Sequence, residues 1–252
     1  MPLLSTLGTG SAKGFGHRKP VRRVNKDLVL HLDPANASCF KSGDTTATNL
    51  VTGNSVTGAS GTPGTGTHTP NTANFPAYSS SNGGVFDFAG GRGMNVEEDL
   101  GSNTSMTIDM WVNKLNDITT DYLTDARNDG GVWFLTNYVS HNINWNSDTA
   151  YNFETPYNAS ANGLLNQWLH IALTGTTGGT GKLYVNGVEV NPYSIQTTMA
   201  SCKFGKNFRI GTRFTNSAQW AGYMGPIKLY SVELSAGQVR RNFEADRMRF
   251  AV

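Results

Sequence analysis

Residues 181–190 read GKLYVNGVEV, and this stretch decides the class of fold. Asn186-Gly187 is the favoured pair for a two-residue hairpin turn, because both central positions of that turn need a positive φ. A slip of one residue would expose the apolar side chains of both strands, so we expect the register to be firm. The expected cross-strand partners are Val185 with Val188, Tyr184 with Glu189, and Leu183 with Val190.

The same alternation of apolar and polar residues recurs along the chain, as half-buried strands require. The clearest cases are LVLHLD (28–33), SMTIDMWV (105–112), WLHIALT (168–174) and FRIGTRF (208–214), with GGVFDFAGG (83–91) and GGVWFLTNY (130–138) as further strands. The face predicted to be buried carries Leu28, Leu30 and Leu32; Met106, Ile108, Met110 and Val112; and Leu169, Ile171 and Leu173. Asp109, Trp111, Trp168 and His170 fall on the opposite face.

One helix is predicted, within LSAGQVRRNFEADRMRF at 234–250. Ser235 followed three residues later by Gln238 forms a capping box. Val239 and Phe243 would share the buried face, with Arg240, Arg241, Glu244 and Asp246 elsewhere on the helix. Residues 41–76 are rich in Gly, Thr, Asn and Ser, which predicts a surface segment with at most one short edge hairpin. The chain therefore reads as all-β, a two-sheet sandwich with one short C-terminal helix.

Residues 1–26 form a basic, glycine-punctuated leader that contains six Lys or Arg residues and no acid. The remaining 14 basic residues face all 18 acids, so the rest of the chain is net negative. We interpret residues 1–26 as an extended docking arm and residues 27–252 as the sandwich. A solvated tail is the alternative interpretation of such a charge run. The arm residues expected to contact an acidic partner are Lys13, Phe15, Arg18, Lys19, Arg22 and Arg23.

The leader lacks the apolar run that a secretory signal needs, and no stretch reaches the ~18 apolar residues of a membrane span. We expect no membrane partner. Two cysteines, Cys39 and Cys202, are too few for a disulfide framework, and buried free thiols are expected, with pairing as the alternative. Nucleic acid is not expected, because the alternation of arginine and aromatic residues typical of a single-strand groove is missing.

The order of these segments resembles the laminin G-like, concanavalin A-like jelly-roll family. The resemblance covers about 222 residues between 28 and 250, and no single motif in it is highly diagnostic. The segments that carry it are LVLHLDPAN (28–36), TNLVTGNSVTG (48–58), YSSSNGGVFDFAG (78–90), NTSMTIDMWVNK (103–114), NQWLHIALT (166–174), GKLYVNGVEV (181–190), FRIGTR (208–213) and GYMGPIKLYSVELSAGQVRRNFEADRMRF (222–250).

Within that family the chain is similar to structural proteins of tailed bacteriophages, particularly phages of marine bacteria and cyanobacteria. The resemblance implies a non-enzymatic virion protein, made in the host cytoplasm, that is present in many copies or as a homo-oligomer and binds other virion proteins through its arm. It implies a capsid decoration or accessory protein, with a tail or baseplate adhesin as the alternative. Contact with host surface glycans is a further implication for either role.

A glycoside hydrolase is the alternative from a different class, because the same fold hosts such enzymes. Retaining hydrolysis needs two carboxyl groups about 5–5.5 Å apart. In TIDMWV (107–112) Asp109 is the only acid, and Thr107 and Trp111 hold the neighbouring positions on its face. His170 is expected to pack beside Trp168 without a catalytic partner. We therefore predict no catalytic residues and no enzyme activity.

We expect no cofactor, with calcium as the alternative. Asp117, Asp121, Asp125 and Asp129 recur every four residues, and DARNDG at 125–130 resembles a calcium loop. Arg127 stands at a ligand position, which weakens Asp125 and Asp129 as candidates and favours a solvated loop.

Aromatic residues outside the predicted core are candidates for stacking on sugars. Packing within the domain, or against a neighbouring subunit, would explain the same residues. The candidates are Trp145, Tyr151, Tyr157 and Trp220.

Overall fold

The computed structural model describes residues 23–59, 71–115, 121–127, 131–136, 142–147, 153–158, 165–190, 198–199 and 201–252. Within them, sixteen strands and one α-helix follow in the order β1 (Leu28–Leu32), β2 (Ala47–Thr48), β3 (Ser55–Gly58), β4 (Ala77–Ser79), β5 (Val85–Asp87), β6 (Met94–Val96), β7 (Ser105–Lys114), β8 (Asp121–Asp125), β9 (Val132–Thr136), β10 (Asn142–Ser147), β11 (Phe153–Asn158), β12 (Trp168–Thr176), β13 (Lys182–Val185), β14 (Val188–Val190), β15 (Phe208–Ile210), β16 (Gly222–Tyr230) and α1 (Ala236–Asp246). Short 3₁₀ turns lie at Thr72–Asn74, Ser81–Gly83 and Arg247–Arg249.

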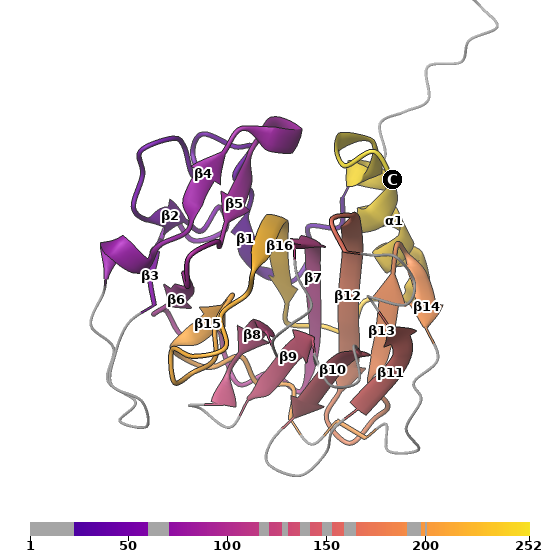
Figure 1. Cartoon of the computed structure of the whole chain (residues 1–252). Coiled ribbons are helices and arrows are strands. Elements are labelled where there is room, and N and C mark those ends of the chain that lie inside the picture. The colour runs from indigo at the N-terminus through magenta and orange to yellow at the C-terminus, as the bar shows by residue number, and fades with distance from the viewer. Residues whose placement is uncertain are drawn as a thin grey trace, which may run out of the picture.

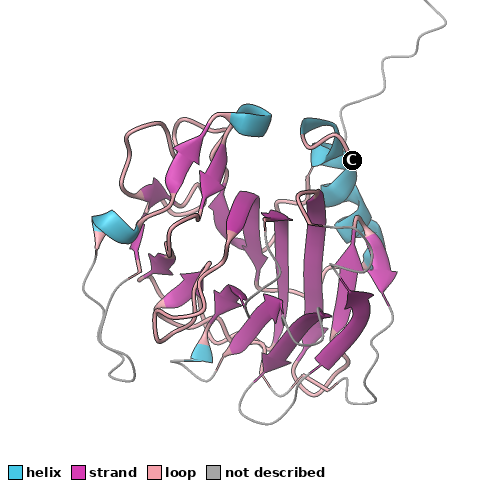
Figure 2. Ribbon diagram, in the orientation of Figure 1, coloured by secondary structure: helices cyan, strands magenta, loops and turns pink. Residues whose placement is uncertain are grey.

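The strands form two antiparallel sheets, which Figures 1 and 2 show as two layers. The first runs β14-β13-β12-β7-β16-β5-β4, and β1 also pairs with β16. The second runs β11-β10-β9-β8-β15-β6-β3-β2. This arrangement confirms the predicted two-sheet sandwich and is consistent with a concanavalin A-like jelly roll. No helix in the described part of the chain has the length and hydropathy to cross a bilayer.

The apolar core lies between the two sheets and follows the predicted alternation. β7 pairs with β12 over nine residues, and both strands turn the predicted apolar residues into the core. The hairpin between β13 and β14 has the expected register, with Val185 opposite Val188. Asn186 and Gly187 have φ of 49° and 75°, as a turn of this type requires. Val188 is nevertheless 59% exposed, because β14 is the edge strand of the first sheet.

The first strand departs from the predicted pattern. A register irregularity between Leu28 and Leu30 turns the Leu28 side chain to the outer face, where it packs beside Val24 and Tyr230. The predicted edge hairpin exists as β2 and β3, although β3 also pairs with β6, so that β2 forms the edge. Cys39 and Cys202 are free and buried, as expected, and burial raises the pKa of each thiol to about 11.

Helix α1 begins with the predicted capping box, in which the Ser235 amide donates to Gln238 Oε1 at 2.9 Å. The helix covers the outer face of the first sheet, near β13 and β14 (Figure 1). Phe243 stacks on Trp111 with ring centroids 5.8 Å apart. Phe250, just beyond the helix, also stacks on Trp111, with a centroid distance of 4.4 Å. Asp246 was predicted to lie away from the buried face, but it is buried.

The structure describes residues 23–26, which the sequence assigned to the arm, and two of them contact the sandwich and α1. The Val24 side chain is buried and its carbonyl accepts a hydrogen bond from the Tyr230 hydroxyl at 2.8 Å. The Val24 amide donates to Asn242 Oδ1 at 2.9 Å. Arg23 and Val24, which the sequence placed in the arm, therefore pack against the sandwich and α1. The other arm candidates, Lys13, Phe15, Arg18, Lys19 and Arg22, lie outside the described residues.

Candidate functional site

A buried cluster of charged groups lies between the first sheet and helix α1. Asp109 on β7 is fully buried and receives three partners from three elements. His170 Nε2 of β12 lies 3.2 Å from Asp109 Oδ2, Lys228 Nζ of β16 lies 3.5 Å from Oδ1, and Asn242 Nδ2 of α1 donates to Oδ2 at 3.0 Å. Burial alone would raise the pKa of Asp109, but His170 and Lys228 outweigh it and hold that pKa well below its usual range.

The cluster continues toward the N-terminal segment through Asp246. Lys228 Nζ lies 3.4 Å from Asp246 Oδ2, and the Arg23 guanidinium binds the same carboxylate through Nε at 3.0 and 3.1 Å. Arg23 also faces Asp33, which Arg249 Nη1 contacts at 2.8 Å. Burial opposes ionisation of Asp246, but Arg23 and Lys228 hold its pKa below the usual value. Every carboxylate of this cluster thus has a cationic partner.

This geometry bears on whether Asp109 could serve as a catalytic carboxylate. The carboxylate has no solvent access, and its oxygens are held by three side chains rather than facing a second carboxyl group. The interpretation of His170 as a residue without a partner is corrected, because it lies against both Asp109 and Trp111. The arrangement suits a structural ion cluster and leaves Asp109 no route to a substrate.

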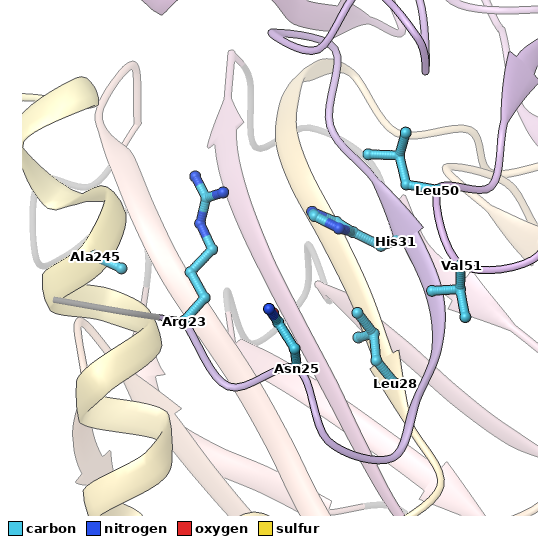
Figure 3. Close-up of a pocket in the computed structure, with 7 residues that line it drawn as sticks. All are labelled: Arg23, Asn25, Leu28, His31, Leu50, Val51 and Ala245. Carbon is cyan, nitrogen blue, oxygen red and sulfur yellow. The ribbon is translucent and has the colours of Figure 1, made fainter. Parts of the chain in front are cut away.

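Beside this cluster lies an open groove of about 550 Å³. Figure 3 shows its side chains between α1, strand β1 and the loop that follows β2. Three of them can form hydrogen bonds, Arg23, Asn25 and His31. The apolar part of the lining consists of Leu28, Leu50, Val51 and Ala245. None of the lining residues is an acid, so the groove offers donors and aliphatic surface without a carboxylate.

His31 is neutral in this groove at ordinary pH. Its burial, reinforced by the charge of Lys228 on the neighbouring strand, lowers the pKa of the imidazole from 6.5 to about 4. Leu50 lies beside His31 because its amide donates to the His31 carbonyl at 2.9 Å. The buried side chain of Asn49 supports the same loop by accepting the His31 amide at 3.0 Å. The groove is therefore held by hydrogen bonds between β1 and this loop.

Two of the four aspartates proposed for a calcium site lie in the described part of the chain, and both are paired with a basic side chain. Asp125 is fully buried and its carboxylate is held by the Arg127 guanidinium, with Nε 3.0 Å from Oδ1, and by the Phe214 amide at 3.1 Å. Asp121 pairs with Lys114 at 3.0 Å. Asp117 and Asp129 lie outside the described residues. Among the side chains that the structure describes, no group of three His, Cys, Asp or Glu residues is placed to hold a metal ion.

Of the four aromatic residues proposed to stack on sugars, only Trp220 has a side chain that the structure describes. Trp220 is 1% exposed and belongs to the core, so its assignment as a sugar-stacking residue is corrected. Its place in the core could not be predicted because it lies in an irregular segment, where alternation gives no signal. Trp145 and Tyr157 lie in β10 and β11, where the structure describes only the backbone, and Tyr151 lies outside the described residues.

Apart from Arg23, which was assigned to the docking arm, the groove residues were not predicted from the sequence as site residues. The alternation in LVLHLD did place His31 on the face opposite Leu30 and Leu32, but nothing in the sequence brings Asn25 and Leu50 next to it. The contact depends on the pairing of β1 with the end of β16 and on the loop that returns beside it.

The comparisons with known proteins agree with the fold. A family model described as the concanavalin A-like lectin/glucanases superfamily matches residues 88–240. Domain 4 of the arabinanase AbnA from Geobacillus stearothermophilus, in complex with arabinotriose, aligns at 18% identity and a TM-score of 0.59, covering 85% of this chain and 97% of that one. No curated protein matches the sequence at a significant level.

Two other similar structures are much longer than this chain. The receptor binding domain of botulinum neurotoxin type G aligns at 14% identity with a TM-score of 0.57, over 86% of this chain and 51% of that one. The sialidase of Trypanosoma rangeli, in complex with the inhibitor DANA, aligns at 16% identity with a TM-score of 0.58, over 90% and 34%. At these identities the likeness shows the fold alone.

Proposed function

Because the chain belongs to the concanavalin A-like lectin/glucanases superfamily, we propose that it is a non-enzymatic glycan-binding domain that serves as a subunit of a bacteriophage particle. The observation that carries the binding role is the open groove of Arg23, Asn25 and His31, which has hydrogen-bonding groups and aliphatic walls but no acid. The role on a particle follows from the sequence resemblance and from the basic segment that precedes Arg23.

The groove has the composition that a sugar requires. The Asn25 amide can donate and accept, and the neutral His31 imidazole can form a further hydrogen bond through Nδ1, since its Nε2 is buried. Leu28, Leu50 and Val51 offer apolar surface for the C–H faces of a pyranose, and Val51 is 43% exposed. Pockets of this size, with a few polar groups among apolar ones, are typical of small-ligand sites.

Similar structures support the class of ligand. The arabinanase domain was solved with arabinotriose, and the binding domain of botulinum neurotoxin DC with SialylT, the latter aligning at 13% identity and a TM-score of 0.54. The arabinanase domain is covered over 97% of its length and the neurotoxin domain over 52%, so the arabinotriose complex gives the stronger support. Absence of catalysis is supported by Asp109, whose carboxylate is sealed beneath α1. The alternative role as a tail or baseplate adhesin uses the same glycan-binding groove.

We expect the full chain to bind at least one glycan on an array, and Asn25→Ala combined with His31→Ala to weaken that binding by about tenfold. Two lost hydrogen bonds of about 0.5–1.5 kcal/mol each account for a change of this size. Lys41→Ala, at an exposed position outside the groove, is the matched control and should leave the affinity unchanged. Absence of any glycan ligand, or a ligand indifferent to the groove variant, would contradict the proposal.

The arm is tested by two truncations that differ by four residues. A chain of residues 23–252 should keep its stability but fail to join purified particles, because it retains Arg23 and Val24 and loses most of the basic arm. A chain of residues 27–252 should be less stable by about 2 kcal/mol, since it also loses the Val24 side chain and the Arg23–Asp246 contact. Thermal melts and immunoblots of gradient-purified particles measure the two effects. Normal incorporation of the 23–252 form would refute arm docking.

A further inference from the structure

A second cleft, of about 360 Å³, opens on the outer face of the first sheet. Its lining comes from three parts of the chain: the start of β12 with Trp168, the β13–β14 turn with Asn186, and the last residues around Phe250. Asn166 and Gln167, just before β12, complete the polar part of the lining. The cleft and the groove of Figure 3 share no lining residue.

Trp168 is held in one orientation and is only partly buried. Its indole N–H donates to Asn82 Oδ1 at 3.0 Å, and its ring lies 4.5 Å from that of Phe250, centroid to centroid. Because the N–H group already has an acceptor, the indole can offer a ligand only its ring surface. A fixed aromatic surface of this kind suits the apolar C–H face of a sugar ring.

The two asparagines provide oriented amides next to this ring. Asn186 Oδ1 accepts the His170 amide at 3.0 Å, so the geometry of the side chain assigns Nδ2 as the group left to donate. Asn166 is exposed, and its backbone is fixed by a 2.8 Å hydrogen bond from its amide to the Lys114 carbonyl. The backbone φ is 60° at Asn166 and 49° at Asn186. Asparagine tolerates such positive values better than most residues. The turns that contain Asn166 and Asn186 therefore fix the positions of both residues beside the Trp168 ring.

The absence of ionisable side chains from the described lining of the cleft favours an uncharged ligand over an acidic one. No side chain that lines the cleft is ionisable, whereas the groove contains Arg23 and His31. An acidic sugar would lose hydration in the cleft without gaining a cationic partner. An uncharged sugar needs only stacking and hydrogen bonds, which Trp168 and the two amides can supply.

We propose that this cleft binds one neutral sugar ring, stacked on Trp168 and hydrogen-bonded by Asn186 Nδ2 and the Asn166 amide. The inference rests on the proposed glycan-binding function and adds a second, chemically distinct contact. When one glycan or one glycan-coated surface engages both sites, the combined affinity exceeds that of either alone.

The test is an NMR titration of the full chain with methyl glycosides of glucose, galactose, mannose and arabinose, and with N-acetylneuraminic acid. The indole N–H resonance of Trp168, assigned by its loss in Trp168→Phe, should move with at least one neutral glycoside and not with the acid. Asn186→Asp keeps the oxygen that accepts from His170 and the turn preference but removes the donor, and it should weaken binding about tenfold. Asn166→Gly should weaken it less, and the groove variant Asn25→Ala should have no effect.

The outcomes separate the two proposals. If the array detects a glycan that depends on the groove while no neutral glycoside moves the Trp168 signal, the cleft inference is overturned and the proposed function stands. Unchanged binding in a folded Asn186→Asp variant also overturns it. If neither the array nor the titration detects a sugar, both proposals fail.

Discussion

Asp109→Ala is expected to lower the free energy of unfolding by about 3–5 kcal/mol, the range found when one partner is removed from a buried ion pair. The loss arises because Lys228 and His170 stay buried without the carboxylate that faces them at 3.5 and 3.2 Å. Asn242, which donates to the same carboxylate, would lose its acceptor as well. Chemical denaturation monitored by tryptophan fluorescence measures the change.

Glu233→Ala is the matched control for this prediction. Glu233 also pairs with a lysine, Lys182, at 3.2 Å, but the two side chains are 29% and 41% exposed. A pair of that kind contributes about 0–1 kcal/mol, because water screens it and both side chains lose rotamer freedom. The double variant Asp109→Ala with Lys228→Met should recover part of the stability, since it removes a buried charge whose remaining carboxylate partner, Asp246 at 3.4 Å, is shared with Arg23. Similar losses for Asp109→Ala and Glu233→Ala would show that the cluster is not the stabilising feature we describe.

Acidification from pH 6.5 to pH 4 is expected to lower the free energy of unfolding by up to about 3 kcal/mol through His31. The pKa of this imidazole falls from 6.5 to about 4 on folding, mainly by burial, and each unit of pKa corresponds to about 1.4 kcal/mol. Below pH 6.5 the unfolded chain binds a proton that the folded chain does not, so stability decreases until the folded His31 also titrates near pH 4. Partial exposure of the side chain reduces the effect toward about 2 kcal/mol.

His31→Gln isolates this effect, because glutamine keeps hydrogen-bonding capacity and does not titrate. The variant should show a flatter dependence of stability on pH between 6.5 and 4 than the unmodified chain. Asp109 and Asp246 act in a lower range: their pKa values are depressed in the folded state, so their contribution is present above about pH 4 and is lost only as the pH falls further. Parallel stability curves for the two proteins above pH 4 would exclude His31 as the cause.

Local features of the sequence were enough to predict much of the fold. Alternation in SMTIDMWV and WLHIALT correctly divided each strand into a core face and an outer face. The Asn186-Gly187 pair gave the register of one hairpin, and Ser235 with Gln238 gave the start of the helix. These predictions succeed because strand alternation, turn φ angles and helix capping depend on residues only a few positions apart.

Contacts between distant segments could not be predicted in the same way. Alternation placed Asp109 and His170 on the outer face, but only the pairing of β7 with β12 and β16 brings His170 and Lys228 to that carboxylate. Arg23 was assigned to a docking arm that binds another protein, whereas it binds Asp246 of the same chain, 223 residues away in the sequence. The groove has the same origin, since Asn25, His31 and Leu50 meet through the irregularity in β1 and the loop after β2.

The sequence by itself therefore determined the architecture, two sheets and one capped helix, and which face of each long strand is apolar. The tertiary structure alone decided which charges meet and which side chains share the groove and the cleft. The physical reason is that burial follows local periodicity, while charge pairing and pocket lining depend on the register between strands and on the path of loops.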